Sequence, residues 1–479
     1  MSKISLWSRD GRMLDRQVRA NQPVEEDGIR RLDIAGITPW LVEALSRYRG
    51  QPVERIVPVG HGAGVVALKE GGLAGECAFP PLDYEQPIPA DIMAAYHAER
   101  DGFAITGSPA LPDGLNIGRQ LYWLDRLHPE VMRTATLVPW AQYWAWFLSG
   151  AAVSEVTSLG CHSDLWDPAA GRFAPMAERM GWAARFAPVA RAGDVVGTLR
   201  PALVEQTGLP VTTQVLAGLH DSNAALLAAR GFPEIAGQEA TILSTGTWFI
   251  AMRLKGAEDR GRLKGAEGEA RLAGDESSIP ILSEARDCLI NVDAYGRPVP
   301  SARFMGGREI ETVIELDTRR VDITPDQPAL LAAVPALVES GAMLLPTLAP
   351  GCGPFPAGPG TWIGRPDDWY ARRAAACLYA ALVAATSLDL IGSHGRLLVE
   401  GRFAEADVFV RALASLRPDM EVYTANAHND VSFGALRLSD PDLRPEGQLV
   451  RAAPLPVSLD AYRARWLANM GLAELGVTA

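Results

Sequence analysis

Hydrophobic and polar residues alternate with a period of two near the start of the chain and follow helical spacing further along. In residues 3–23, KISLWSRDGRMLDRQVRANQP, the alternation surrounds Asp10 and Gly11, which predicts a β-hairpin with an Asp-Gly turn. The apolar spacing of residues 114–132 predicts an amphipathic helix, and that of residues 141–151 predicts a buried one.

Other segments pass from a strand pattern through glycine. Residues 53–69, VERIVPVGHGAGVVALK, predict one strand to residue 59, a glycine-rich turn and a second strand. Residues 214–231 predict a strand that leads into a helix, residues 240–254 a strand interrupted by a Gly-Thr turn, and residues 396–416 a strand, a glycine turn and a helix. Residues 372–395 predict a long helix. This alternation predicts an α/β architecture with ligand sites in the turns after the strands.

The length of 479 residues exceeds one ordinary hydrophobic core and predicts two domains. The helix pattern breaks at residues 231–238, GFPEIAGQ, before a new strand begins, so we divide the chain into residues 1–236 and 237–479. The hexapeptide RLKGAE occurs twice, at residues 253–258 and 262–267, and its glycine and charged residues predict an exposed insertion.

The overall charge excludes one class of partner. Lysine and arginine number 45 against 57 aspartates and glutamates, which gives a net charge of −12 and argues against nucleic-acid binding. Apolar residues 140–153 are too few to cross a bilayer, and residues 374–391 contain polar positions that suit a buried helix. With no basic-then-apolar signal pattern at the N-terminus, we expect a cytoplasmic protein without membrane contact. The five cysteines form no CxxC pair, which favours free thiols and no structural zinc.

His220 and Asp221 stand where a predicted strand leads into a helix. An aspartate there can cap the helix by accepting backbone N–H groups. It also lies just past a strand end, where open α/β sheets place their ligands. His220 is equally a turn residue or a site residue, so the residues alone leave both interpretations open.

Three other turns contain glycine beside a strand. In residues 244–248, STGTW, small residues let backbone amides approach a phosphate, although β-hairpins carry similar sequences. Residues 354–362, PFPAGPGTW, suit a rigid loop, and residues 399–405, VEGRFAE, suit a strand-to-helix turn. Together these turns favour a nucleotide bound between two domains.

The order and spacing of these segments resemble the FGGY family of carbohydrate kinases, relatives of glycerol kinase, xylulokinase and rhamnulokinase. The resemblance covers most of the chain and implies the two-domain, actin-like ATPase fold (ribonuclease H-like), with a sugar-binding first domain, a nucleotide-binding second domain and an interdomain cleft. Residues 114–132 resemble the helix ahead of the family's sugar site. Residues 141–167 resemble its YLxxxLTG…T…AS segment, which implies that Ser158 and His162 face the substrate.

The segment AGLHDSNAALLA is similar to the family's G-x-x-D-x-x-x-A turn, whose aspartate is the catalytic base. The resemblance therefore implies that Asp221 is the base and that His220 lies beside the sugar. LSTGTW resembles the glycine-threonine turn that contacts the ATP phosphates, which implicates Thr245, Gly246 and Thr247.

Two later segments resemble the nucleotide side of the family. RFMGGREIE is similar to the helix that lines the nucleotide, which implies contacts from Gly307 and Glu311. LLVEGRFAE resembles the adenine-side turn, which implies contacts from Gly401 and Glu405, although EGR stands where the family has a glycine-rich run.

The opening of the chain departs from the family pattern. The usual first strand with its D-x-G-x-T phosphate loop is not found, and MSKISLW resembles the second strand. Lys3 stands where the loop's trailing lysine falls, which implies a nucleotide contact. We therefore expect the first N-terminal strand to be missing, and we leave the magnesium ligands unassigned.

Two segments fall near the family's sugar-specificity positions. GHGAG, residues 60–64, makes His61 and Ala63 candidate sugar contacts, with a plain glycine-rich connection as the alternative. LDYEQ lies near an Asp-x-Arg position and makes Asp83 and Glu85 candidates. None of these residues reproduces a known specificity pattern, although His220 leans towards rhamnulose or fuculose.

The resemblance implies an ATP-dependent carbohydrate kinase that uses Mg²⁺ and phosphorylates a ketose or related polyol. In phosphoryl transfer a carboxylate such as Asp221 accepts the proton of the attacking hydroxyl. One alternative is a non-catalytic sugar-sensing protein on the same fold. A hydrolase using His220 and Asp221 is another, without a G-x-S-x-G elbow to support it. The expected partner is a small-molecule sugar, and the sequence allows either a monomer or a homodimer.

Overall fold

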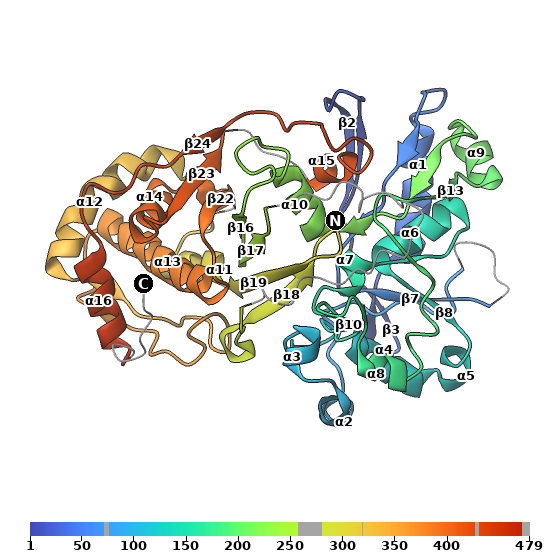
Figure 1. The fold of residues 1–479 in the computed structure, drawn as a ribbon, viewed down its shortest axis with the longest axis horizontal. Helices are drawn as coiled ribbons and strands as arrows, with labels where there is room; N and C mark the ends of the chain where they lie inside the picture. The colour runs from blue at the N-terminus through green and yellow to red at the C-terminus, as the bar shows by residue number, and fades with distance from the viewer. Residues whose placement is uncertain (71–75, 257–279, 319, 427–430, 472–479) are drawn as a thin grey trace.

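The computed structural model describes residues 1–70, 76–256, 280–318, 320–426 and 431–471. The chain forms two halves that lie side by side in Figure 1, the first coloured blue to green and the second mainly yellow to red, with its first strands (residues 240–254) still green. The second RLKGAE copy and the last two residues of the first lie outside the described residues.

The first half combines short strands with helices of up to 13 residues. Its elements are β1 (Ser2–Trp7), β2 (Met13–Arg19), β3 (Val24–Glu26), β4 (Ile29–Arg31), α1 (Ile34–Ser46), β5 (Arg55–Ile56), β6 (Val59–Gly60), β7 (Val65–Leu68), α2 (Ala90–Glu99), α3 (Phe103–Thr106), α4 (Ile117–Leu127), α5 (Pro129–Met132), β8 (Thr136–Pro139), α6 (Trp140–Ser149), β9 (Ser154–Glu155), α7 (Val156–Leu159), β10 (Trp166–Asp167), β11 (Arg172–Phe173), α8 (Pro175–Arg179), β12 (Val189–Ala190), β13 (Val195–Thr198), α9 (Pro201–Thr207), β14 (Gln214–Leu216), β15 (Leu219–His220) and α10 (Asp221–Ala229).

The second half is organised by longer strands. Its elements are β16 (Ala240–Thr245), β17 (Phe249–Leu254), β18 (Cys288–Val292), β19 (Pro298–Phe304), α11 (Gly306–Ile314), α12 (Gln327–Ser340), β20 (Met343–Leu344), β21 (Trp362–Ile363), α13 (Trp369–Leu390), β22 (Gly395–Gly401), α14 (Asp407–Leu416), β23 (Met420–Ala425), α15 (Val431–Leu436), β24 (Leu449–Arg451) and α16 (Asp460–Asn469), with short 3₁₀ turns η3 (Glu284–Arg286), η4 (Thr324–Asp326) and η5 (Arg402–Glu405).

The first half confirms the predicted hairpin and corrects one predicted strand. Strands β1 and β2 pair antiparallel around Gly11, whose φ of 88° suits glycine. The strand expected to run to residue 59 is instead two short strands, β5 and β6, interrupted at Pro58. Proline has no N–H to donate to a sheet, and the carbonyl of Pro58 accepts a hydrogen bond from Leu219 N. Strand β5 pairs with β14, and β6 pairs with β15.

The second half contains a seven-stranded sheet in the order β18-β19-β17-β16-β22-β23-β24. Strands β16, β22 and β23 are parallel to one another, and the remaining pairs are antiparallel. The predicted interruption of residues 240–254 is the turn of the β16–β17 hairpin. Strand β22 runs through η5 into α14, as the strand, turn and helix pattern predicts.

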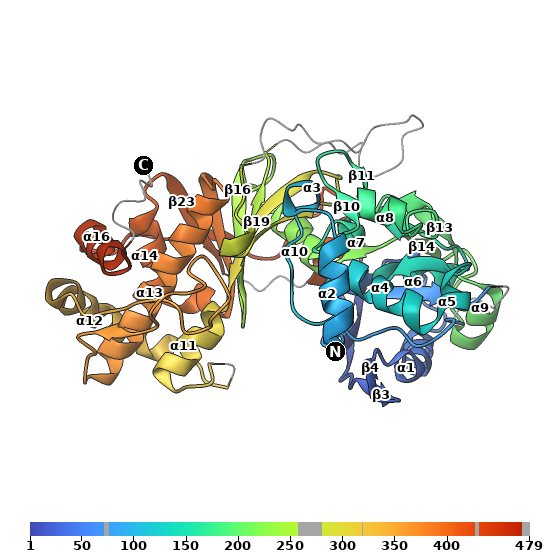
Figure 2. The same cartoon turned by 90° about the horizontal axis from the view of Figure 1, so that it is seen from below.

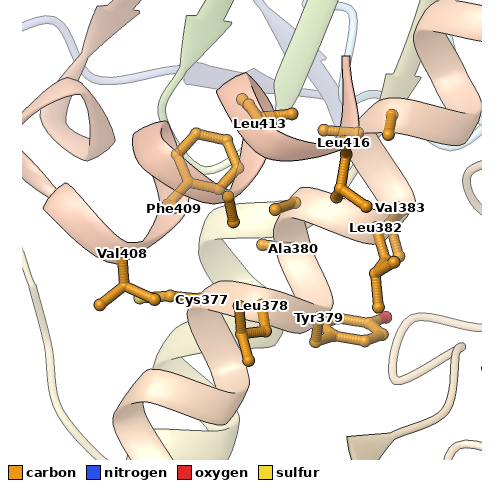
Figure 3. Close-up of a cluster of buried hydrophobic side chains, with 14 of the residues drawn as sticks. Cys377, Leu378, Tyr379, Ala380, Leu382, Val383, Val408, Phe409, Leu413 and Leu416 are labelled. Carbon is orange, nitrogen blue, oxygen red and sulfur yellow. The ribbon is translucent and has the colours of Figure 1, made fainter. Parts of the chain in front are cut away.

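The two faces of this sheet are covered differently. Helices α13 and α14 pack on one face, and Figure 3 shows their interlocking side chains, among them Leu378, Phe409 and Leu413. In Figure 2 these helices lie on the side of the sheet away from α10. Helix α13 is the only described helix long and apolar enough to cross a membrane, but 83% of its apolar window is buried inside the protein, as in an ordinary core helix.

Helices α10 and α15 pack against each other between the halves (Figure 1). Their backbones approach so closely that a Cβ at Gly434 would overlap the carbonyl oxygen of Ala224. On its other side, α10 places Leu226 and Ala229 against the sheet residues Ile242 and Met252. The helix that starts at Asp221 is thereby fixed to both halves.

Candidate active site

The turn into α10 depends on one glycine. Gly218 has a φ of 77°, and a Cβ there would overlap the carbonyl oxygen of Pro58, so only glycine lets this chain pass so close to β6. The backbone then pairs as β15 and enters α10 at Asp221. The close pairing with β6 brings Asp221 near the glycine-rich segment of residues 60–64.

The side chain of Asp221 is half-exposed, and that of its neighbour His220 is buried. Its side chain is 48% accessible, whereas that of His220 is 8% accessible. Asp221 Oδ1 accepts a hydrogen bond from Ser222 N at 2.7 Å and lies 3.2 Å from His220 Nε2. Asp221 Oδ2 has no hydrogen-bond partner in the described part of the chain. Asp221 is the first helical residue rather than the N-cap, so its bond to Ser222 N occupies one oxygen and leaves the other available.

Two further histidines lie beside this turn. His61 stacks on Trp140 with ring centroids 5.9 Å apart and meets the edge of Tyr84 at 5.1 Å. Burial lowers the pKa of His61 to about 4, although the Asp221 carboxylate acts in the opposite direction. Ala63, two residues on, is buried, and its carbonyl accepts a hydrogen bond from Gln120.

His162 reaches the same region from the end of α7. Its φ is 35°, and Nδ1 lies 2.9 Å from the carbonyl oxygen of Leu115. Burial, together with the positive charges of Arg303 and of His220 when it is protonated, lowers its pKa to about 4. Burial also lowers the pKa of His220. We call His61, His162, His220 and Asp221 the base cluster.

The candidates Asp83 and Glu85 are held by one arginine. Arg30 Nε lies 3.4 Å from Asp83 Oδ2, and its Nη2 lies 2.6 Å from Glu85 Oε2. Asp83 is buried and its charge acts on His61, whereas Glu85 is exposed. Between them, Tyr84 contacts His61, and its pKa is raised by burial and by neighbouring carboxylates that include Asp221. The structure therefore brings Asp83 to the base cluster and turns Glu85 outward onto Arg30.

A buried chain of hydrogen bonds supports the base cluster, and the sequence does not predict it. Glu155 is fully buried and accepts hydrogen bonds from Thr157 N at 2.9 Å and Thr157 Oγ1 at 2.5 Å. Thr157 Oγ1 in turn accepts a hydrogen bond from His220 N at 2.9 Å. Burial raises the pKa of Glu155 to about 7. Ser158, expected to face a substrate, is buried, and its N–H points at Glu155. The acidic N-cap ahead of Thr157 was the sequence signal that could have indicated this chain.

The second group of predicted residues gathers at the end of β16. We call Gly246, Gly307 and Gly401 the glycine cluster. Gly307 and Gly401 let two backbone segments approach each other closely, and Gly246 leaves space beside the turn. A Cβ at Gly307 would overlap the carbonyl oxygen of Gly246, and one at Gly401 would overlap that of Thr245. At Gly246 itself a Cβ would meet only the carbonyl oxygen of Trp248, at 3.7 Å. The turn is therefore open on its outer side and closely packed on its inner side.

The two threonines of this turn differ in environment. Thr245 Oγ1 donates to the carbonyl of Glu400 at 2.5 Å and accepts from Phe403 N at 3.1 Å, so its side chain joins two turns inside the protein. The side chain of Thr247 is exposed, and its carbonyl accepts Arg308 N at the start of α11.

The three remaining residues predicted to contact the nucleotide are Glu311, Glu405 and Lys3. Glu311 accepts hydrogen bonds from Thr318 and forms an ion pair with Arg402 at 3.0 Å. Glu405 is exposed on η5, and Lys3 is exposed on β1. Glu311 also lines a cavity of about 270 Å³ beside α11, while a larger cavity of about 520 Å³ near β24 and α14 contains none of the predicted residues.

Comparison with known proteins identifies the family. Residues 237–446 match the family described as carbohydrate kinase FGGY, C-terminal domain. The crystal structure of a carbohydrate kinase from Novosphingobium aromaticivorans is 69% identical, with a TM-score of 0.90 over 98% of this chain and 97% of that one. A xylulose kinase from Rhodospirillum rubrum, 18% identical, shares the fold with a TM-score of 0.75 over 98% of this chain and 96% of that chain.

L-fuculokinase of Escherichia coli strain K12 is 30% identical over 202 residues, which are 40% of this chain and 39% of the enzyme. The match to this curated relative thus spans well under half of its length. The matched C-terminal domain and the nearly complete alignment with the Novosphingobium kinase agree with the two-domain actin-like fold seen here. The chain belongs to the FGGY family of carbohydrate kinases.

Proposed function

We propose that the protein is an ATP-dependent kinase that transfers the γ-phosphate to a hydroxyl of a ketose or related polyol, with Asp221 as general base. The observation that supports this most directly is the unshared Oδ2 of Asp221. A half-exposed carboxylate oxygen at a helix N-terminus, next to a buried histidine, is placed to accept a proton from a bound hydroxyl.

His220 contacts this carboxylate as a neutral ring. Because burial lowers the pKa of His220, its ring is neutral near pH 7, and the contact with Asp221 Oδ1 is not an ion pair. As the sugar oxygen attacks the γ-phosphorus, its proton passes to Asp221, and ADP leaves with the electrons of the broken bond. The work of the protein is then to orient the hydroxyl and to stabilise charge.

The base cluster has the chemistry of a sugar site. With Nδ1 of His162 donating to the carbonyl of Leu115, the neutral ring presents Nε2 as a hydrogen-bond acceptor for a hydroxyl. The rings of Trp140 and Tyr84 around His61 provide apolar surface for the C–H faces of a sugar. The similarity to L-fuculokinase supports a fuculose- or rhamnulose-like ketose, with xylulose next.

The glycine cluster has the features of a binding site for the phosphates of a nucleoside triphosphate. The open outer side of Gly246 and the exposed Thr247 leave backbone and hydroxyl donors available to phosphate oxygens. Mg²⁺ bound with ATP would neutralise phosphate charge. Among the described residues no three His, Cys, Asp or Glu side chains gather as a metal site, so we propose that phosphates and water supply most Mg²⁺ ligands.

The first experiment is a substrate screen. ADP release is measured with a coupled assay across ketohexoses, 6-deoxyketohexoses, ketopentoses and polyols, with ATP and Mg²⁺. We expect sugar-dependent ADP release that is strongest for a deoxyketohexose. Wild-type protein that releases no ADP with any of these compounds would contradict the proposed function.

Asp221→Asn tests the proposed mechanism. We expect kcat to fall by roughly 10²- to 10⁴-fold with sugar affinity nearly unchanged, because the amide keeps the shape but cannot accept the proton. Asp368→Asn is the matched control, since Asp368 caps α13 by accepting Ala371 N at 2.8 Å and lies outside both clusters. Equal turnover in the two variants would remove the assignment of the base.

A further inference from the structure

A row of residues crosses the seven-stranded sheet beside the glycine cluster. In the sheet register Glu400 pairs with Ser244, Ser244 with Ile250, and Ile250 with Arg303, so all four side chains project from one face. The next row on this face is buried and consists of Leu398, Ile242, Met252 and Ser301. The first three of these residues belong to the hydrophobic cluster that also contains residues of α10. The Arg303 row is less covered, and Ser244 is exposed.

Arg303 is fixed on this face by two neighbours. Its Nε donates to Asp287 Oδ1 at 2.7 Å, and its guanidinium carbon lies 4.7 Å from the ring centroid of Trp248. Asp287 is itself held, because its Oδ2 accepts a hydrogen bond from Gly353 N at 3.1 Å. The two terminal nitrogens of Arg303 have no hydrogen-bond partner among the described residues. The arginine is therefore oriented but retains four unused N–H groups.

Arg303 also lies between the two clusters. Trp248 belongs to the turn that contains Gly246, which places the guanidinium at the edge of the glycine cluster. On the other side, the charge of Arg303 acts on the ring of His162, and His162 is likewise affected by His220, the neighbour of Asp221. Helix α7, which leads to His162, packs against β18 of the sheet (Figure 1).

We propose that Arg303 binds the γ-phosphate and stabilises the negative charge on the phosphoryl group during transfer. This assignment rests on the proposed kinase function. The bond from the γ-phosphorus to the β,γ-bridging oxygen breaks, the bond to the sugar oxygen forms, the sugar proton goes to Asp221, and ADP retains the electron pair. A guanidinium suits this role because its planar N–H groups engage two phosphoryl oxygens at once.

The chain offers a matched control for this residue. Arg253 lies on β17 of the same sheet, is 16% accessible like Arg303, and forms an ion pair with Glu239 through Nε at 2.7 Å. It pairs with Thr241 at the opposite end of β16, four residues from the turn. Arg253→Gln therefore removes a similar ion pair without touching either cluster.

The test compares Arg303→Gln, Arg303→Lys and Arg253→Gln in turnover and in binding of ADP, with and without aluminium fluoride, by calorimetry. We expect Arg303→Gln to lower kcat by roughly 10²- to 10³-fold, as loss of one charge stabiliser does, while ADP affinity stays within about threefold of wild type. Arg303→Lys should recover part of kcat. Aluminium fluoride should tighten ADP binding by wild type and Arg253→Gln, but not by Arg303→Gln.

The outcomes separate this inference from the proposed function. If Arg303→Gln keeps wild-type kcat, or loses ADP affinity as strongly as kcat, Arg303 is structural and the inference is wrong. If the wild type phosphorylates no sugar, the proposed function fails, and the aluminium fluoride comparison still reads the effect of Arg303 on a phosphoryl mimic. Arg303→Lys keeps a cation beside Asp287, so it remains informative if the glutamine variant folds poorly.

Discussion

The base cluster and the glycine cluster are constructed in opposite ways. The base cluster consists of side chains: three histidines and a carboxylate, with His220 held through the buried Thr157. The glycine cluster consists of backbone, and at Gly307 and Gly401 even one added carbon would overlap a neighbouring carbonyl. We infer that replacing a side chain in the first changes chemistry while the fold persists, whereas adding a methyl group in the second changes geometry.

Gly307→Ala should show the largest effect of this difference. The new Cβ overlaps the carbonyl oxygen of Gly246, so the start of α11 must move away from the turn. We expect the free energy of unfolding to fall by about 1–3 kcal/mol, as for an overpacked core, and ATP affinity to fall by on the order of tenfold or more. Urea unfolding and nucleotide titration measure the two quantities.

Gly102→Ala is the control for this variant, because a Cβ at Gly102 meets nothing within 4 Å and its φ is −64°. We expect it to leave stability and nucleotide affinity unchanged. If Gly307→Ala behaved like Gly102→Ala, the glycine cluster would tolerate side chains and the contrast drawn above would be wrong.

Thr157→Val should show a smaller effect, on the other cluster. Valine keeps the shape but leaves the N–H of His220 without its acceptor and removes one of the three donors to Glu155, the Thr157 hydroxyl. A buried unpaired group costs about 1–3 kcal/mol, and we expect kcat to fall by about tenfold with the KM for ATP unchanged. Steady-state kinetics on both substrates checks this split.

Thr157→Ser restores the hydroxyl and should restore kcat. Loss of kcat in the serine variant as well would mean that packing of the threonine methyl group, and not the hydrogen bond to His220, supports the base cluster.

The sequence predicted the turns better than the contacts across them. The Asp-Gly hairpin, the β16–β17 turn and the helix that starts at Asp221 follow from local spacing and glycine positions, and all are observed. The sequence did not indicate that Thr157 bonds His220, 63 residues away, or that Arg303 stacks on Trp248. Such pairs are set by which strands become neighbours in the sheet, and local patterns do not encode that order.

The same limit applies to the partners of two predicted residues. Glu311 was expected to contact the nucleotide, which stays a prediction, and in the fold it forms an ion pair with Arg402 that the sequence did not indicate. Glu85 was expected beside Asp83 at the sugar, and in the fold it is exposed and forms an ion pair with Arg30. In both cases the carboxylate forms an ion pair with an arginine that is distant in the sequence.

The smallest expected effect concerns pH. Burial lowers the pKa of His162 to about 4, whereas in the unfolded chain a histidine titrates near pH 6.5. Between these values the folded state binds fewer protons than the unfolded state, so His162 makes the protein less stable as the pH falls from about 6.5 to 4. Glu155 acts oppositely, since its pKa is raised to about 7 and its burial lowers stability as the pH rises from about 4.5 to 7.

His162→Asn isolates the effect of His162, because asparagine tolerates the left-handed φ of 35°. Urea unfolding at pH 7, 5.5 and 4.5 should show the variant losing less stability on acidification than wild type, while the exposed His394→Asn loses as much as wild type. Parallel losses in all three proteins would show that His162 is not held neutral in the fold, and the base cluster would then lack the buried character that distinguishes it from the glycine cluster.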